Sequence, residues 1–314
     1  MAHAWGGWAV PRRVLLLCTA VAVALLVPLV AGYLLAGVPA TLAIALGYIA
    51  CSGPALRLRP RHALALAVPV AMTGAVAVAL RGQPVAAACF VALCCLLVAP
   101  ASMVADTLMA GLPSVAAVLV AVPGDLQPGP VALWLLVGGA AVVGLAALLP
   151  SSGSTATGLP ARRAWLHASV MGVVVGAAVY VVALLDWPHG YWLPLTLSIV
   201  LRPFDDETLR KSWQRVLGTV AGALVAVVLS FVLPPWVVVV AVGACLVLAL
   251  CYLVRADYPR QVIFLTPVVV LLGPAVSPGG LAVERVLLTV LGAALAAVVA
   301  VGVARFDRRW PEEG

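Results

Sequence analysis

The chain has 314 residues, of which 65% are apolar and 9% are charged, and its net charge is +7. A soluble globular protein carries about 25% charged residues because its surface must face water, so this composition excludes an ordinary soluble protein. The apolar runs are long enough to cross a bilayer as helices, and they do not alternate with polar residues as the strands of a membrane barrel do. We therefore predict an all-α integral membrane protein, because a helix satisfies its own backbone hydrogen bonds in lipid.

Proline, glycine and charged residues divide the chain into twelve apolar segments, which we predict to be transmembrane helices. In chain order, these segments are 14–36, 38–53, 63–80, 84–100, 105–122, 131–149, 164–185, 190–201, 216–233, 236–253, 260–275 and 284–304. A count of ten or eleven stays open because 38–53 and 190–201 are short for a complete crossing. In addition, only Pro100 and Asp106 divide the region 84–122.

The basic residues of the loops orient these helices, because cytoplasmic loops are enriched in lysine and arginine. With both termini in the cytoplasm, only Arg81 and Arg285 lie on the outer side. The basic residues on the inner side are Arg12, Arg13, Arg57, Arg59, Arg61, Arg162, Arg163, Arg202, Arg210, Lys211, Arg215, Arg255, Arg260, Arg305, Arg308 and Arg309. We predict a multi-pass protein of the bacterial inner (plasma) membrane, with lipid as a partner. The scatter of these residues through short loops argues against a nucleic-acid partner.

An offset of about 150 residues brings two halves of the chain into register. Arg12-Arg13 before the first segment matches Arg162-Arg163 before the seventh, and Ala105-Asp106 matches Ala256-Asp257. Six segments per half is an even number, so we predict two parallel six-helix halves related by an axis along the membrane normal. The expected domains are an N-terminal membrane half (1–150), a cytoplasmic linker (151–163) and a C-terminal membrane half (164–314).

A second repeat, at an offset of 70 residues, lies inside the C-terminal half. The stretch WQRVLGTVAGALVA (213–226) aligns with VERVLLTVLGAALA (283–296), and the two copies begin the ninth and twelfth segments. Because three segments separate the copies, they enter the membrane from opposite sides. This arrangement predicts a nested inverted 3+3 repeat, as in many secondary transporters. Arg285 is then the inverted counterpart of Arg215, which explains its place on the outer side.

The loop RPFDDETLRKSWQRVLGT (202–219) is rich in charge, and two interpretations of it stay open. It is either the capped start of a helix whose cations meet lipid phosphates, or an inner vestibule in which Arg215 gathers an organic anion. Asp106 and Asp257 are equivalent in the parallel repeat. They are either solvated loop residues or groups for proton transfer or gating.

Glycines at a spacing of four residues indicate close contacts between helices. Gly172 and Gly176 form one such pair, Gly218 and Gly222 form another, and Gly292 is the repeat counterpart of Gly222. Small residues let helix backbones approach each other where lipid supplies no hydrophobic driving force. We predict helix packing at these positions rather than a lining for substrate.

The sequence has no GxSxG, HExxH or Walker A motif, so we expect no enzymatic activity, no cofactor and no metal. The seven cysteines lack metal-binding spacing and are interpreted as buried small apolar residues. His167 and His189 are interpreted as interfacial residues rather than as parts of a proton relay.

Two stretches of the C-terminal half carry a recognisable pattern of residues. In the first, HGYWLPLTLSIVLRPFDDETLRKSWQRVLGTVAGALVA (189–226), the pattern falls on Tyr191-Trp192, Thr196, Pro203, Arg215, Gly218, Thr219 and Gly222. In the second, RADYPRQVIFLTPVVVLL (255–272), it falls on Tyr258, Thr266 and Pro267. Both stretches resemble the fusaric acid resistance (FUSC-like) family of aromatic acid exporters. The resemblance implies a multi-pass inner-membrane protein and, for some relatives, efflux of aromatic carboxylic acids. Many members also carry a large soluble domain, in whose place this chain has only the linker.

The sequence is compatible with two functions. The first is ATP-independent efflux of small organic acids, aromatic carboxylic acids among them, with the site between the halves and Arg215 at its inner mouth. The candidate substrate-path or gating residues are Arg215, Thr219, Thr196, Tyr191, Trp192, Tyr258, Asp106, Asp257 and Arg285. The alternative is a membrane scaffold or accessory subunit of a cell-envelope complex that transports nothing, which the sparse polar lining favours. Either a homo-oligomer or an envelope partner fits the sequence.

Overall fold

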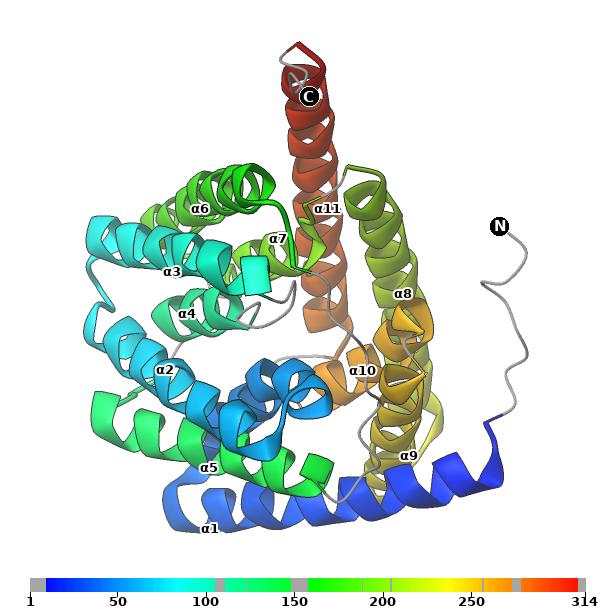
Figure 1. The fold of residues 1–314 in the computed structure, drawn as a ribbon. Helices are drawn as coiled ribbons and strands as arrows, with labels where there is room; N and C mark the ends of the chain where they lie inside the picture. The colour runs from blue at the N-terminus through cyan, green and yellow to red at the C-terminus, as the bar shows by residue number, and fades with distance from the viewer. Residues whose placement is uncertain are drawn as a thin grey trace. The chain divides into compact units, whose positions relative to one another are not determined.

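The described part of the chain is helical. The computed structural model describes residues 10–104, 111–122, 124–147, 158–187, 189–203, 205–255, 257–272 and 278–309, and within these ranges it contains no strand. The helices are α1 (Arg12–Arg57), α2 (Pro60–Ala79), α3 (Pro84–Val104), α4 (Leu112–Ala121), α5 (Pro128–Ala147), α6 (Ala161–Leu184), α7 (Trp192–Val200), α8 (Asp205–Val232), α9 (Pro235–Val254), α10 (Tyr258–Leu272) and α11 (Pro278–Arg309). Figure 1 labels them in chain order. The predicted all-α class is confirmed.

α1 consists of two helices that meet at a kink. Gly37 has φ 72° and ψ −156°, a conformation outside the helical region that glycine adopts without steric cost. The kink falls between the predicted segments 14–36 and 38–53. Each of the other ten predicted segments overlaps one of the helices α2 to α11, although α8 begins at Asp205, eleven residues before the predicted start at 216.

Eight helices in the described ranges are long and apolar enough to cross a membrane, counting α1 once. α4 has 10 residues and α7 has 9, which gives each a length of about 15 Å. The hydrocarbon core of a bilayer is about 30 Å thick, so neither helix crosses it alone. Twelve complete crossings therefore stay a prediction.

Large apolar side chains cover much of the helix surfaces. Leu34 is 77% exposed, Leu35 76% and Phe231 82%, and many leucines and valines of the long helices are exposed by half or more. A soluble monomer rarely exposes contiguous apolar surface on this scale, whereas lipid tails are its natural solvent. Together with the long apolar helices, this makes the chain a multi-pass membrane protein. Six of the seven cysteines are buried, as interpreted, and Cys89 is exposed.

The chain divides into two compact units. The first unit comprises Met1–Leu26 and Gln214–Val286, and the second comprises Val27–Trp213 and Leu287–Gly314. These two units are defined by contacts between residues, whereas the two predicted halves are defined by repeated sequence. The units therefore do not test the parallel halves, which stay a prediction.

The short helix α4 is at the centre of the second unit. Its residues 112–120 are all buried, and it contacts α2, α3, α6 and α7. Around it, α3 lies beside α6 and α2 lies beside α5 (Figure 1). A helix that ends at membrane depth leaves backbone groups unsatisfied by its own turns, and such ends are tolerated only inside protein. The burial of α4 meets this requirement.

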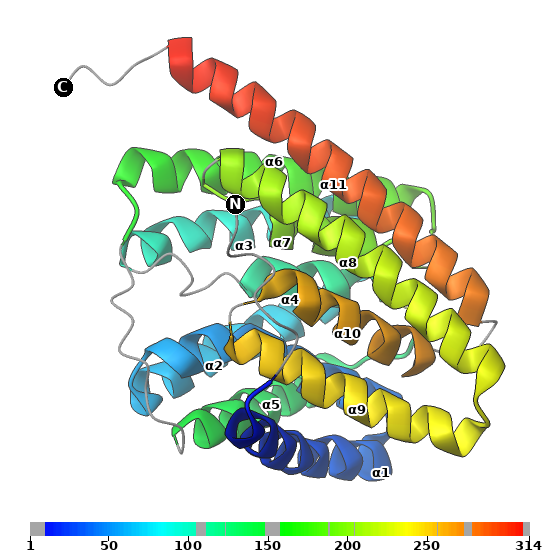
Figure 2. The same ribbon diagram turned by 90° about the vertical axis from the view of Figure 1, so that its right-hand side faces the viewer.

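In the first unit, α9 and α10 are neighbours (Figure 2), and two glycines of α8 lie close to α10. A Cβ atom at Gly218 would lie 3.0 Å from the carbonyl oxygen of Pro259. At Gly222 it would lie 2.5 Å from the carbonyl oxygen of Ile263 and 2.7 Å from Cβ of Thr266. These glycines let the two helix backbones approach each other.

The two copies of the 70-residue repeat have nearly the same pattern of burial. Arg215 and Arg285 are both buried, and so are Thr219 and its counterpart Thr289. The contacts repeat as well. A Cβ atom at Gly292 of α11 would lie 3.0 Å from Cβ of Thr196 of α7, just as a Cβ atom at Gly222 of α8 would lie 2.7 Å from Cβ of Thr266 of α10. Thr196 and Thr266 are themselves 70 residues apart. The glycine of each long helix therefore packs on the threonine of the other copy's short helix. The inverted sense of the repeat stays a prediction.

Candidate functional site

Arg215 of α8 places a positive charge inside the first unit. The residue is 7% exposed, and its Nη1 donates a hydrogen bond to the hydroxyl oxygen of Tyr258 at 3.2 Å. A phenol hydroxyl accepts a hydrogen bond but brings no negative charge. Among the residues that the structure describes, Arg215 has no carboxylate partner, and its Nε has no hydrogen-bond acceptor. The site therefore contains a buried guanidinium with donor capacity to spare.

Thr219 lies one helical turn beyond Arg215. Residues four apart share a face of a helix, so both side chains belong to the face of α8 that Gly218 and Gly222 bring against α10. Thr219 is 1% exposed, and its hydroxyl has no hydrogen-bond partner among the described residues. We name Arg215, Thr219 and Tyr258 the α8–α10 polar site.

The start of α10 is held by an ion pair within its first turn. Asp257 Oδ2 lies 2.7 Å from Nη1 of Arg260, and Asp257 Oδ1 accepts a weaker hydrogen bond, 3.4 Å long, from the backbone N–H of Arg260. An aspartate at this position caps a helix by accepting from an N–H that no helical carbonyl reaches. This contact fixes Tyr258, the first residue of α10, opposite Arg215.

An aromatic pair supports the same end of α10. The rings of Tyr252 and Phe264 are stacked with centroids 5.6 Å apart and planes 5° apart. The guanidinium carbons of Arg255 and Arg260 lie 5.8 and 5.7 Å from the centroid of Tyr252. Cations at this distance from an aromatic ring are attracted by its quadrupole. The pair holds the turn between α9 and α10, which carries Asp257.

The sequence interpretation missed Arg260, Tyr252 and Phe264. A signal for Arg260 was present, since it follows Asp257 by three residues and so reaches it within one turn. Nothing in the sequence indicated that Tyr252 and Phe264 stack. They lie on different helices, and each is an ordinary residue for an apolar helix.

The remaining candidates are found elsewhere. Arg285 is buried in the first turns of α11, within the first unit. Tyr191, Trp192 and Thr196 belong to the second unit, where the rings of Tyr191 and Trp192 lie 4.8 Å apart. Thr196 is fully buried, and its hydroxyl has no hydrogen-bond partner in the described ranges. Asp106 lies outside the described residues.

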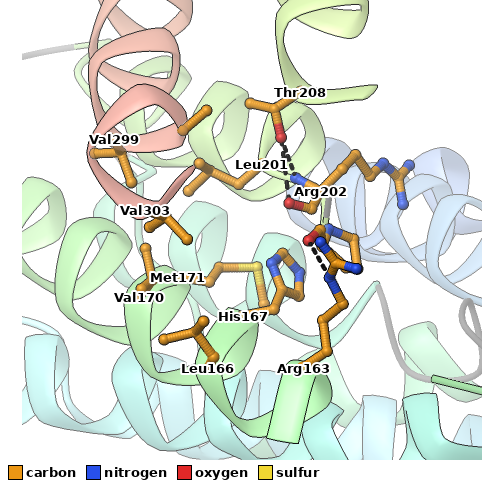
Figure 3. Close-up of a pocket in the computed structure, with 12 residues that line it drawn as sticks. Arg163, Leu166, His167, Val170, Met171, Leu201, Arg202, Thr208, Val299 and Val303 are labelled. Atoms are coloured by element: carbon orange, nitrogen blue, oxygen red, sulfur yellow. Dashed lines mark hydrogen bonds between the residues drawn. The ribbon is translucent and has the colours of Figure 1, made fainter. Parts of the chain in front are cut away.

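The second unit also has a small basic cavity, of about 40 Å³, between α6, the α7–α8 connection and α11 (Figure 3). Arg163, His167 and Arg202 line it together with Thr208 and mostly apolar residues. The sequence interpretation placed Arg163 and Arg202 in loops and His167 at an interface. It did not bring the three together.

The comparisons with known proteins concern the part of the chain that carries the α8–α10 polar site. Residues 177–299 match the family described as fusaric acid resistance protein-like. The resemblance noted from the sequence is confirmed for this segment. It includes α7, α8, α9 and α10 in full, and with them Arg215, Thr219 and Tyr258.

A curated relative is an uncharacterized protein of Synechocystis sp. It is 29% identical over 134 residues, which is 40% of this chain and 17% of that protein. The chain thus covers about a sixth of the length of the relative it matches. No solved structure gives a significant match.

Proposed function

We propose that the protein is an ATP-independent exporter of small organic acids, with aromatic carboxylic acids as the substrate class. The observation that carries the proposal is Arg215, a buried guanidinium whose described partner is the neutral hydroxyl of Tyr258. A buried charge is costly unless it is paired, and guanidinium pairs best with a carboxylate, through two parallel hydrogen bonds. A substrate carboxylate supplies this missing partner.

The surroundings of Arg215 suit a ligand that binds and leaves. Thr219 offers a buried hydroxyl on the same face of α8, and Tyr258 offers a phenol hydroxyl from α10. α10 has 15 residues, and short or broken helices at membrane depth are where secondary transporters form their substrate sites. The family match over residues 177–299 supports membrane transport in the same segment.

The other candidates enter the proposal in lesser roles. Thr196, Tyr191, Trp192 and Arg285 are proposed for the substrate path, and Asp106 and Asp257 for gating. Asp257 is the less favoured of the two aspartates, because its carboxylate is already paired with Arg260. The proposed location is the bacterial inner membrane with both termini in the cytoplasm, and the proposed partners are lipid and the substrate anion.

The experiment is efflux of radiolabelled aromatic acids from cells with the gene deleted, restored or overexpressed, with and without a protonophore. We expect faster efflux on overexpression and an at least 10-fold loss in Arg215→Ala, since a charge-assisted hydrogen bond contributes about 1.5–3 kcal/mol. The matched control is Arg210→Ala, an exposed arginine of the same helix, which should export normally. Protein levels in the membrane are measured for each variant.

An accessory or scaffold subunit is the second candidate. Charged residues are scarce inside the apolar helices, which favours a protein that transports nothing itself. Efflux that is the same in deleted and overexpressing cells, across a panel of acids, would support this candidate and overturn the exporter.

A further inference from the structure

The short helix α7 of the second unit carries a buried hydroxyl that makes no hydrogen bond. Thr196 is fully buried, and its Oγ1 has no partner among the residues that the structure describes. A threonine inside a helix has the carbonyl oxygen of the residue four before it within reach. For Thr196 that residue is Trp192, so a local acceptor is offered and is not used.

Two corresponding threonines do bond to their own helices. Thr41 of α1 matches Thr196 in the parallel repeat, since each follows a proline by two residues, and its hydroxyl donates to the carbonyl oxygen of Gly37 at 3.2 Å. Thr266 of α10, the counterpart in the 70-residue repeat, donates to the carbonyl oxygen of Val262 at 2.9 Å. Because a buried hydroxyl without a partner is costly, the difference at Thr196 needs a physical reason.

A pair of serine hydroxyls joins α7 to the enclosed helix α4, which lies beside it (Figure 1). The Oγ atoms of Ser114 of α4 and Ser198 of α7 are 2.9 Å apart. Ser198 donates its one proton to the carbonyl oxygen of Leu195 at 2.9 Å, so Ser114 is the donor between the two helices. A hydrogen bond between two neutral hydroxyls is weak enough to break and form again.

α7 also rests on α11 of the same unit, through side chains. A Cβ atom at Gly292 would lie 3.0 Å from both Cβ and Cγ2 of Thr196 and 3.5 Å from Cδ1 of Leu193. By contrast, the equivalent Gly222 of α8 lies against the backbone of α10 at Ile263. Side chains rearrange more easily than backbone, so the contact of α7 with α11 permits a small shift of α7.

We propose that α7 is a gating helix with two hydrogen-bonded positions. In the position described, Ser114 and Ser198 are bonded to each other and the hydroxyl of Thr196 is idle. In the other position, α7 has shifted away from α4, the serine pair is separated, and the hydroxyl of Thr196 has a partner. One hydrogen bond replaces another, so the two positions are close in free energy and both are populated.

This movement opens and closes the part of the substrate path that lies in the second unit. Its role in transport rests on the export function proposed above, whereas the movement itself does not. Two measurements on the purified full-length protein are therefore needed, one of stability with transport and one of the helix position alone.

The first measurement compares Thr196→Val with Thr266→Val. Valine keeps the shape of threonine, so Thr196→Val removes the idle hydroxyl and should raise the unfolding temperature in detergent by about 2–4 °C. The control, Thr266→Val, removes a made hydrogen bond and should lower the unfolding temperature. Thr196→Val should also exchange labelled acid about 5-fold more slowly in proteoliposomes, because the other position has lost its hydrogen bond. A threonine that only packs would not make the protein more stable and slower at once.

The second measurement follows α7 without using transport. In a background without cysteine, Ser114→Cys and Ser198→Cys are oxidised with copper phenanthroline to a disulfide, which dithiothreitol reduces again. The cross-link should form faster when Thr196→Val is added, because that substitution favours the position in which α4 and α7 are joined. It should also block the exchange of label until it is reduced.

Equal rates of cross-linking with and without Thr196→Val, or full exchange by the cross-linked protein, overturn the gate. A different outcome separates the gate from the export function. If the wild type exchanges no label, but Thr196→Val still raises the unfolding temperature and speeds cross-linking, then α7 moves as proposed and only the export function fails.

Discussion

At the scale of single residues, the structure explains an arginine that the positive-inside rule does not. Arg81 lies in the turn between α2 and α3, on the predicted outer side. Its guanidinium donates to the carbonyl oxygen of Gly124 at 2.7 Å and also to that of Val122, just after α4. Burial lowers the pKa of Arg81, and Asp125 opposes this shift. Arg81 thus supplies hydrogen-bond donors to the carbonyls that follow the end of α4, which no helical N–H reaches.

Replacing Arg81 should therefore destabilise the fold. Arg81→Met removes donors from two carbonyls, and each hydrogen bond to a charged group contributes about 1.5–3 kcal/mol. We expect a lower unfolding temperature for the purified protein in detergent, and a smaller decrease for Arg81→Lys, which reaches one carbonyl at a time. The exposed Arg59→Gln is the control. Equal unfolding temperatures for Arg81→Met and Arg59→Gln would contradict this role.

The sequence indicated some of the candidate site and not the rest. It singled out Arg215 and Tyr258, because both lie in recognisable patterns. It could not show that they hydrogen-bond to each other, since 43 residues separate them. It also could not show that Arg163, His167 and Arg202 line one cavity, because that depends on how α6 packs beside the α7–α8 connection.

At the scale of helices, hydropathy located each described helix but not its role. α4 and α7 have the same apolar composition as the long helices, so the sequence predicted them as ordinary spans. What distinguishes α4 is burial on all sides, which depends on its neighbours α2, α3, α6 and α7. The kink in α1 was easier to predict, because Gly37 stands two residues before Pro39.

The α8–α10 contact gives a prediction at the same scale. In Gly222→Ala, the new methyl group meets backbone of α10 at Ile263, which cannot move aside as a side chain can. Overpacking of this kind costs about 1–3 kcal/mol. The control is Gly243→Ala in α9 of the same unit, where a Cβ atom meets nothing within 4 Å.

Gly243→Ala should leave stability unchanged or raise it by up to about 1 kcal/mol, because alanine favours the helix. Unfolding temperatures in detergent compare the two variants. If Gly222→Ala were as stable as Gly243→Ala, α8 and α10 would not be in close contact.

At the scale of the whole molecule, membrane orientation rests on the distribution of basic residues. The prediction is tested most simply at the two ends of α2, a helix of 20 residues that is long enough to cross. In a background without cysteine, Arg61→Cys should react with a membrane-impermeant thiol reagent only after the cells are opened. Gln83→Cys should react in intact cells, because it follows α2 on the predicted outer side. The reverse pattern of labelling would overturn the orientation, and both positions labelling from one side would mean that α2 does not cross.

We propose that the chain itself moves organic acids and that Arg215 binds their carboxylate. The most direct measurement is uptake of a radiolabelled aromatic acid into proteoliposomes that contain only the purified protein and are preloaded with the same unlabelled acid. Exchange of label should be rapid for the wild type and for Arg210→Ala, and at least 10-fold slower for Arg215→Ala. Exchange that is no faster than in protein-free liposomes, or equal in wild type and Arg215→Ala, would contradict the claim.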